Sequence, residues 1–91
     1  MHVLLTVDLD PDTDGYAITR FCDFMKQQEW TRIKLANTFR ARFEDQATRL
    51  GAIATARGDV RKAANAAGIV RYQVIAQVGP EAPSVWDEFH L

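Results

Sequence analysis

The order in which two kinds of hydrophobic periodicity follow each other is the feature that most constrains how this chain can fold. Apolar side chains at every second residue predict a strand, and apolar side chains at three- and four-residue steps predict a helix with one buried stripe. The sequence contains six such segments, which predict strand, helix, strand, strand, helix and strand at residues 3–9, 15–28, 30–35, 38–43, 52–67 and 70–78. This order predicts an α+β ferredoxin-like sandwich, in which a four-stranded antiparallel sheet of spatial order 4-1-3-2 carries both helices on one face.

The predicted strand at residues 38–43 has one apolar and one cationic face. Phe39, Ala41 and Phe43 alternate with Thr38, Arg40 and Arg42. Because helices need an apolar surface to pack on, we expect the phenylalanine side to face them. Arg40 and Arg42 are then left on the open face of the sheet, toward water or a partner.

Local signals mark the ends of both predicted helices. Asp14 is a good N-cap for the first helix, and the aspartates near that end suit the helix dipole. Gly68 stands where a left-handed cap is expected after the second helix, with Ile69 placed for the accompanying apolar contact. Gly58 lies inside this helix and weakens it by about 1 kcal/mol relative to alanine. We therefore expect the second helix to start late.

Composition indicates one globular domain at residues 1–79 followed by a tail at residues 80–91. Hydrophobic residues make up 47% of the chain and charged residues 25%, which argues against disorder and against a membrane span. The first apolar run, residues 1–7, is too short for a signal peptide and lacks a basic leader, so we expect a cytoplasmic protein. Cys22 is the single cysteine, which excludes an internal disulfide and a cysteine-rich metal site. We expect it to be a buried, inert thiol.

Large apolar side chains mark the tail. Ser84 and Asp87 have the spacing of a capping box, and Trp86, Phe89 and Leu91 accompany them. Left in water, these side chains would form an exposed apolar patch. We therefore expect the tail to dock on its own domain or on a sister subunit, with Trp86 and Phe89 as partner-binding residues.

The open face of the predicted sheet collects positive charge. Residues of the outward parity include five cations and one aspartate, namely Arg32, Lys34, Arg40, Arg42, Arg71 and Asp8. Such a face can bind a nucleic-acid backbone, with Trp30 as a stacking surface at its edge. It can equally pair with a second copy of itself, with Leu4 and Ile75 at the apolar centre. The net charge of -1 does not help nucleic-acid binding, and the central strands lack the paired aromatic residues of an RNA-recognition motif.

Four closely spaced residues after the first predicted strand resemble part of a metal-binding loop. Asp10, Asp12, Asp14 and Gly15 match the first half of a calcium loop of the EF-hand type. Phe21 stands where the bidentate carboxylate of such a loop should be. Capping and compensation of the helix dipole explain the same aspartates without a metal.

Asp8 is the polar end of the predicted central strand. A carboxylate held there, with Asp10 nearby, can bind a Mg²⁺ ion that also contacts phosphate, above all where two copies meet. The alternative is a solvated aspartate close to a loop. The sequence contains no Ser-His-Asp or Cys-His set and no phosphate-binding glycine loop.

Three segments give the sequence a resemblance to known small ferredoxin-like proteins. They are a first strand that ends in Asp8, a hairpin strand that reads Asn37-Thr38-Phe39-Arg40-Ala41-Arg42-Phe43, and a closing strand at residues 74–79. Over residues 1–79 the chain resembles the GhoS-type antitoxin endoribonucleases and the CRISPR-associated dimeric nucleases of spacer adaptation. The resemblance implies a homodimer that acts on RNA or is held on nucleic acid, with Asp8 matching the metal-associated aspartate of the CRISPR-associated family. Val7 departs from that family, which usually has an aromatic residue before the aspartate.

Two functions of different classes follow. The first is a small homodimeric RNA-binding protein that uses Arg32, Lys34, Arg40, Arg42 and Arg71, with metal-dependent cleavage of RNA at Asp8. The second is a non-catalytic protein-binding module, such as an antitoxin or a phage-type inhibitor, that uses its sheet face or its C-terminal tail.

Overall fold

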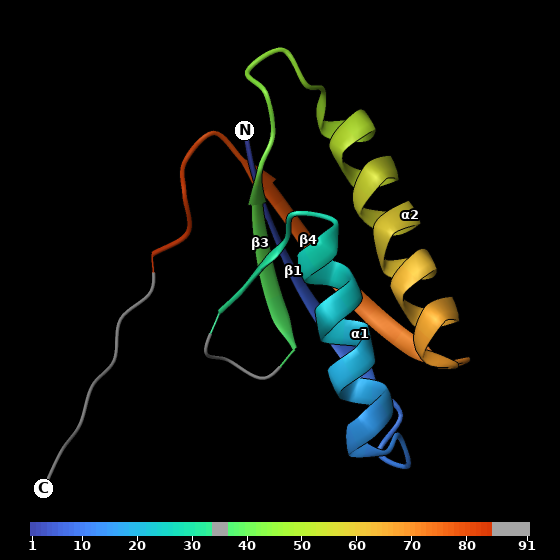
Figure 1. The fold of residues 1–91 in the computed structure, drawn as a ribbon. Coiled ribbons are helices and arrows are strands. Elements are labelled where there is room, and N and C mark those ends of the chain that lie inside the picture. Colours follow the sequence, from blue (N-terminus) through green and yellow to red (C-terminus); the bar gives the residue numbers. More distant parts are fainter. Residues whose placement is uncertain (34–36, 85–91) are drawn as a thin grey trace, which may run out of the picture.

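The computed structural model of the chain, which describes residues 1–33 and 37–84, has the predicted ferredoxin-like architecture. Its elements in chain order are β1 (His2–Leu9), α1 (Gly15–Gln27), β2 (Thr31–Arg32), β3 (Thr38–Arg42), α2 (Arg49–Ala67) and β4 (Tyr72–Gly79). The strands form one antiparallel sheet in the order β2-β3-β1-β4, which confirms the predicted arrangement. Figure 1 shows both helices on one side of this sheet. We call that side the inner face and the opposite side the outer face.

The core lies between the inner face and the two helices. Alternate residues of β1 point inward and are buried, from Val3 to Leu9, as the two-residue periodicity requires. The ring of Phe21 on α1 meets the ring of Phe39 on β3 edge to face, with centroids 5.9 Å apart. The buried positions of α2 are mostly small, namely Ala52, Ala56, Val60, Ala63 and Ala64. Small side chains allow α2 to approach its neighbours closely.

Side chains before each helix fix where it begins. Asp14 Oδ1 accepts a hydrogen bond from the Ala17 backbone N–H at 2.7 Å, which confirms the predicted cap of α1. Thr48 Oγ1 accepts from the Gly51 backbone N–H at 3.0 Å and caps α2. The expected late start of α2 is therefore wrong. The cap at Thr48 lets the helix begin at Arg49 and continue through Gly58.

The end of α2 has the predicted left-handed cap. Gly68 has φ 72°, its backbone N–H donates to the Asn65 carbonyl at 3.2 Å, and the Ile69 N–H donates to the Ala64 carbonyl at 2.9 Å. These two bonds form a Schellman motif, in which glycine is preferred because it has no Cβ to clash. Ile69 is buried, so the turn also delivers an apolar side chain to the core.

One edge of the sheet is only partly covered by the helices. Along the inner face, α2 packs beside α1 and approaches β4 at few points. Val74 and Ala76 point to the inner side of β4, as their pairing with Val7 and Leu5 requires, yet both are exposed.

Neither α1 nor α2 combines the length and the hydropathy needed to cross a membrane.

Candidate functional site

The outer face carries the sheet residues that the helices leave uncovered. Cross-strand pairing fixes its rows: Arg42 lies opposite His2, Arg40 opposite Leu4, and Thr38 opposite Thr6. On the other side of β1, Gln77 lies opposite Leu4, Ile75 opposite Thr6, and Gln73 opposite Asp8. Thr31 of β2 joins the same face because it pairs with Arg40.

Charges of opposite sign lie at opposite ends of this face. Arg40 and Arg42, both exposed, flank the end of β1 that carries His2. Asp8, also exposed, lies near the other end of β1, beside Gln73. Six residues of strand separate His2 from Asp8 along β1, which corresponds to about 20 Å. The outer face is therefore polarised along the strand direction.

Apolar and neutral side chains lie between these two ends. Ile75 is 74% exposed in the middle of the face, and Leu4 is half-buried in the adjacent row. The hydroxyl oxygens of Thr6 and Thr38 are 3.4 Å apart across the ladder, within hydrogen-bonding distance. An exposed isoleucine next to satisfied hydroxyls can be covered by a partner at little polar desolvation cost.

The predicted position of Arg32 on the outer face is wrong. Thr31 pairs with Arg40 and Arg32 pairs with Phe39, so Arg32 points to the helix side. Consistently, burial raises the pKa of the Cys22 thiol on α1, and the nearby charge of Arg32 partly opposes that shift. The physical reason is the residue two positions earlier. Trp30 points inward to the core, and residues two apart in a strand point to the same face, so Arg32 points to the helix side as well.

Trp30 is not an exposed stacking surface either. It is 2% exposed, its Nε1–H donates to Asp59 Oδ2 at 2.9 Å, and its ring meets Phe43 edge to face. A buried indole with a satisfied N–H is a core residue. The predicted strand at residues 30–35 is correspondingly shorter, with β2 described only at Thr31–Arg32. Lys34 lies outside the described residues, as do Trp86 and Phe89 of the tail.

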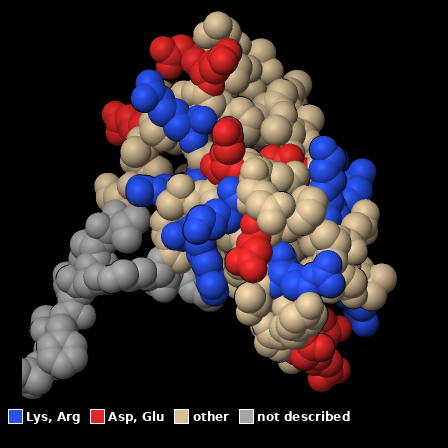
Figure 2. All heavy atoms as spheres, viewed as in Figure 1, with Lys and Arg blue, Asp and Glu red and all other residues tan. Residues whose placement is uncertain are grey.

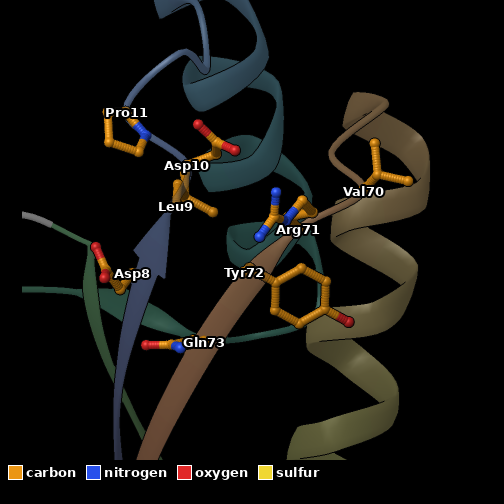
Figure 3. Close-up of a pocket in the computed structure, with 8 residues that line it drawn as sticks. All are labelled: Asp8, Leu9, Asp10, Pro11, Val70, Arg71, Tyr72 and Gln73. Carbon is orange, nitrogen blue, oxygen red and sulfur yellow. The ribbon is translucent and has the colours of Figure 1, made fainter.

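Arg71 lies at the acidic end of the sheet, away from Arg40 and Arg42. It directly precedes Tyr72, which pairs with Leu9, and so sits beyond the Asp8 end of β1. A shallow depression of about 720 Å³ at this end is lined by Asp8, Leu9, Asp10, Pro11, Val70, Arg71, Tyr72 and Gln73. Figure 3 shows Arg71 pointing toward Asp10, whereas Asp8 points away from both. The predicted cations therefore do not form one continuous patch.

The aspartates after β1 shape the turn into α1. Asp10 Oδ1 accepts from the Asp12 backbone N–H at 3.0 Å, and the Asp10 carbonyl accepts from the Thr13 N–H at 2.9 Å. With Asp14 capping α1, these bonds support the structural interpretation of the acidic run. Within residues 1–33 and 37–84, no three histidine, cysteine, aspartate or glutamate side chains are grouped so as to hold a metal. If Asp8 and Asp10 bind Mg²⁺, water or a second copy has to supply further oxygen ligands.

The structure also forms a groove that the sequence did not indicate. It lies between α2 and β4, has a volume of about 360 Å³, and is lined by Leu5, Ile53, Ala56, Arg57, Val60, Arg61, Tyr72, Val74 and Ala76. The available signal in the sequence was the uncharged run of β4. That run fits a buried central strand as well as an uncovered edge, so the sequence alone did not distinguish them.

Comparison of the chain with protein-family models, with curated proteins and with solved structures finds no match. The ferredoxin-like fold is confirmed by the structure. The resemblance to antitoxin endoribonucleases and to CRISPR-associated nucleases stays a prediction from sequence.

Proposed function

We propose that the chain is a non-catalytic protein-binding module that forms a homodimer through its outer face. The observation that supports this proposal is the arrangement of that face, with Arg40 and Arg42 at one end, Asp8 at the other, and Ile75 exposed between them. Each end is complementary to the opposite end of an identical face.

The arrangement selects one of two ways in which two sheets can stack. Facing sheets pack about 10 Å apart, with side chains from both faces interdigitating. If the β1 strands of the two copies run in the same direction, arginine ends meet arginine ends. If the strands run in opposite directions, Arg42 of each copy approaches Asp8 of the other, and Ile75 lies near the centre. The charges therefore favour the second arrangement.

The apolar centre and the charged ends contribute differently to such a dimer. Burial of one isoleucine side chain is worth about 1.5–3 kcal/mol, and a dimer buries two. Exposed ion pairs are worth about 0.2–1 kcal/mol each. Ile75 thus supplies most of the affinity, whereas the charges set orientation and rate of association.

A charge-swap experiment tests whether the two charged ends attract each other across the interface. It supports the antiparallel orientation if each variant alone dimerises less than the parent, because parallel strands would already oppose like charges in the parent. Arg42→Asp cancels the net positive charge of one end, because Arg40 remains there, and Asp8→Arg replaces the carboxylate of the other end with a cation. Each variant alone is therefore expected to dimerise less than the parent protein. Mixed in equal amounts, the two variants are expected to form heterodimers. The new aspartate at position 42 then faces the new arginine at position 8, and the native Asp8 faces the native Arg42. Sedimentation equilibrium at low salt measures the association, and circular dichroism checks that each variant is folded.

Two results would count against the proposal. The first is a mixture that does not associate although both variants are folded, which would contradict the antiparallel arrangement. Ile75→Asp can leave the dimer intact, which removes the outer face as the interface. Gln73→Asp is a less central substitution on the same face and serves as the control for a general effect of added negative charge.

Binding of RNA is the second candidate function, because Arg40 and Arg42 are adjacent outward positions of one strand and both are exposed. Their cross-strand neighbours on β1 are Leu4 and His2 rather than carboxylates, so the strand pairing leaves this positive charge uncompensated. A pair of arginines at this spacing can contact successive phosphates of a single strand.

The salt dependence of RNA binding separates the two functions. For the RNA-binding function, replacing both arginines in Arg40→Ala/Arg42→Ala is expected to reduce the slope of log affinity against log salt by about 1.4, since each phosphate contact with a single strand contributes about 0.7. Arg57→Ala/Arg61→Ala, which removes two arginines from α2, is the matched control and is expected to leave the slope unchanged. No RNA binding at 50 mM salt would leave the protein-binding function alone.

Cleavage at Asp8 is a separate prediction of this second candidate. With Mg²⁺ and bound RNA, the parent protein is expected to release shorter products, and Asp8→Asn is expected to bind RNA without cleaving it. Equal cleavage by both proteins would remove Asp8 from the catalytic role, whatever the outcome of the binding experiment.

A further inference from the structure

Among the residues that the structure describes, none protects the free edge of the β4 strand in the usual ways. Within the described part of the sheet it pairs only with β1, so its other edge presents backbone N–H and C=O groups without a strand partner. Its eight residues, Tyr72–Gly79, include no charged residue and no proline. Natural proteins commonly block open edges with lysine, proline, a bulge or a covering segment. An uncharged edge of this length is suited to receive another strand.

A groove runs beside this open edge on the inner face. Its floor is apolar and buried, with Leu5, Ala56 and Val60 each at most 2% exposed. Tyr72 and Val74 of β4 form one wall, and Figure 3 shows the Tyr72 ring turned toward α2. Val74 remains 38% exposed although it has inward parity. A strand added to β4 would place alternate side chains over this floor.

The helix side of the groove is positively charged. Arg57 and Arg61 line it from α2, one helical turn apart, and both are exposed. Figure 2 shows basic side chains over α2 in this view. The groove therefore combines an apolar floor, a backbone edge and a cationic rim.

We propose that this edge and groove bind an extended, acidic segment of another protein, which adds to the sheet as a fifth strand beside β4. Its backbone pairs with β4, its apolar side chains fill the groove over Val60, and its carboxylates approach Arg57 and Arg61. Strand addition of this kind takes affinity from the main chain and specificity from alternate side chains. The site lies on the helix side, so it does not depend on what covers the outer face.

The charge of the rim argues against a second copy of this chain as the occupant. Antiparallel pairing of two β4 strands about a dyad would bring both α2 helices toward the same axis on the inner side. Arg57 and Arg61 of one copy would then approach the same arginines of the other. Like charges in this position disfavour self-pairing, whereas an acidic partner satisfies them.

Labelled peptides test the proposal with the full-length protein. The probe is a short fluorescein-labelled peptide in which every second residue is threonine and the residues between them alternate valine and glutamate, so that valine and glutamate share the face that an added strand turns to the groove. Its control has lysine in place of every glutamate. Fluorescence anisotropy is expected to show binding of the glutamate peptide only, with affinity that falls as salt is added. No binding of the glutamate peptide, or equal binding of both peptides, overturns the proposal.

Charge reversal on α2 tests the rim. Arg57→Glu/Arg61→Glu is expected to weaken binding of the glutamate peptide at least about tenfold, which corresponds to about 1.4 kcal/mol. Arg49→Glu/Lys62→Glu reverses two charges of the same helix that do not line the groove, and it is expected to change the affinity less than about twofold. Equal losses in the two folded variants would show a general charge effect and would overturn the assignment of the rim.

Backbone methylation tests the strand pairing. Peptides N-methylated at every second residue keep their side chains but lose the N–H groups of one edge. When the methyl groups lie on the edge that faces β4, binding is expected to be abolished. When they lie on the opposite edge, which faces water, the peptide is expected to bind like the unmethylated peptide. Similar binding of both phases overturns strand addition.

A truncated protein identifies a competing occupant. Residues 85–91 contain Val85, Trp86, Asp87, Glu88, Phe89 and Leu91, so the chain itself carries an acidic and apolar segment. Protein ending at Ser84 is expected to bind the glutamate peptide as the full chain does. A tenfold or larger gain in affinity on truncation would assign the groove to the chain's own C-terminal segment and overturn the proposal of a foreign partner.

Discussion

The indole N–H of Trp30 donates a hydrogen bond to Asp59 Oδ2 at 2.9 Å and so joins the start of β2 to the middle of α2. Gln28 strengthens the same junction, since its Nε2 donates to the Asp59 backbone carbonyl at 3.0 Å. The Phe43 ring packs edge to face on the indole, with centroids 6.1 Å apart. This junction holds the second helix against the hairpin and accounts for the inward direction of Trp30.

Loss of this junction is expected to destabilise the fold. Trp30→Phe keeps an aromatic ring but leaves the half-buried Asp59 carboxylate without its donor, which is expected to lower the free energy of unfolding by about 1–3 kcal/mol. Asp59→Asn retains an oxygen acceptor and is expected to cost less. Urea titration followed by circular dichroism measures both, and equal stability of Trp30→Phe and the parent would contradict the role of the bond.

Two glycines of the α2 region are expected to respond in opposite directions to alanine. Gly68→Ala places a Cβ at φ 72° and is expected to destabilise the protein by about 1–2 kcal/mol. Gly58→Ala lies inside α2 with no atom within 4 Å of the added Cβ, and it is expected to stabilise by about 0.5–1 kcal/mol. Thermal unfolding of the pair tests the sign of each change. A shift in the same direction for both would contradict the assigned backbone conformations.

The turn after β1 provides a test of the structural role of the aspartates. Asp14→Ala removes the N-cap of α1 and is expected to cost about 0.5–2 kcal/mol of stability. Asp12→Ala removes an exposed carboxylate two residues before Asp14. Asp12 bonds to Asp10 through its backbone N–H and not through its side chain, so little change is expected. A similar loss in both variants, or a Ca²⁺-dependent gain in the stability of the parent, would favour a metal loop over capping.

The thiol of Cys22 is expected to react slowly. Burial raises its pKa, and the charge of Arg32 only partly offsets that effect, so at pH 8 a smaller fraction is thiolate than in the unfolded chain. Because the folded state holds the proton more tightly, stability is expected to fall as pH rises above the ordinary thiol pKa of about 8.5. Alkylation by iodoacetamide with and without urea measures the first effect. Cys22→Ala is the control for the second, since its stability is expected to decline less over the same pH range.

The order of elements and the caps at Asp14 and Gly68 were predictable from sequence because they depend on local periodicity and on single side chains, whereas the cap at Thr48 was missed. Asp14 and Gly68 act within a few residues of their own positions. The face of Arg32 was not predictable in the same way. A strand described over only two residues has too short an alternation to fix its own direction, and the deciding contact of Trp30 is to Asp59, 29 residues away in the chain.

The groove beside β4 depends on packing between elements that are distant in sequence. An uncharged strand such as Tyr72–Gly79 is typical of the centre of a covered sheet, and its sequence does not show that α2 rests against α1 instead of over it. Likewise, the separation of Arg40 and Arg42 from Arg71 follows from the register of three strands. Residue parity alone placed them on one face, but the pairing of Arg42 with His2 and of Tyr72 with Leu9 places them at opposite ends.

The small side chains of α2 determine how much room the groove beside β4 offers. Ala56 sits on the floor of the groove and contributes only a methyl group, so a larger residue there reduces the room for an incoming side chain without altering the β4 backbone. If the groove binds an extended peptide as proposed, substitutions on α2 are expected to change which peptide side chains fit. Substitutions along the edge of β4 are expected to change the affinity that comes from main-chain pairing.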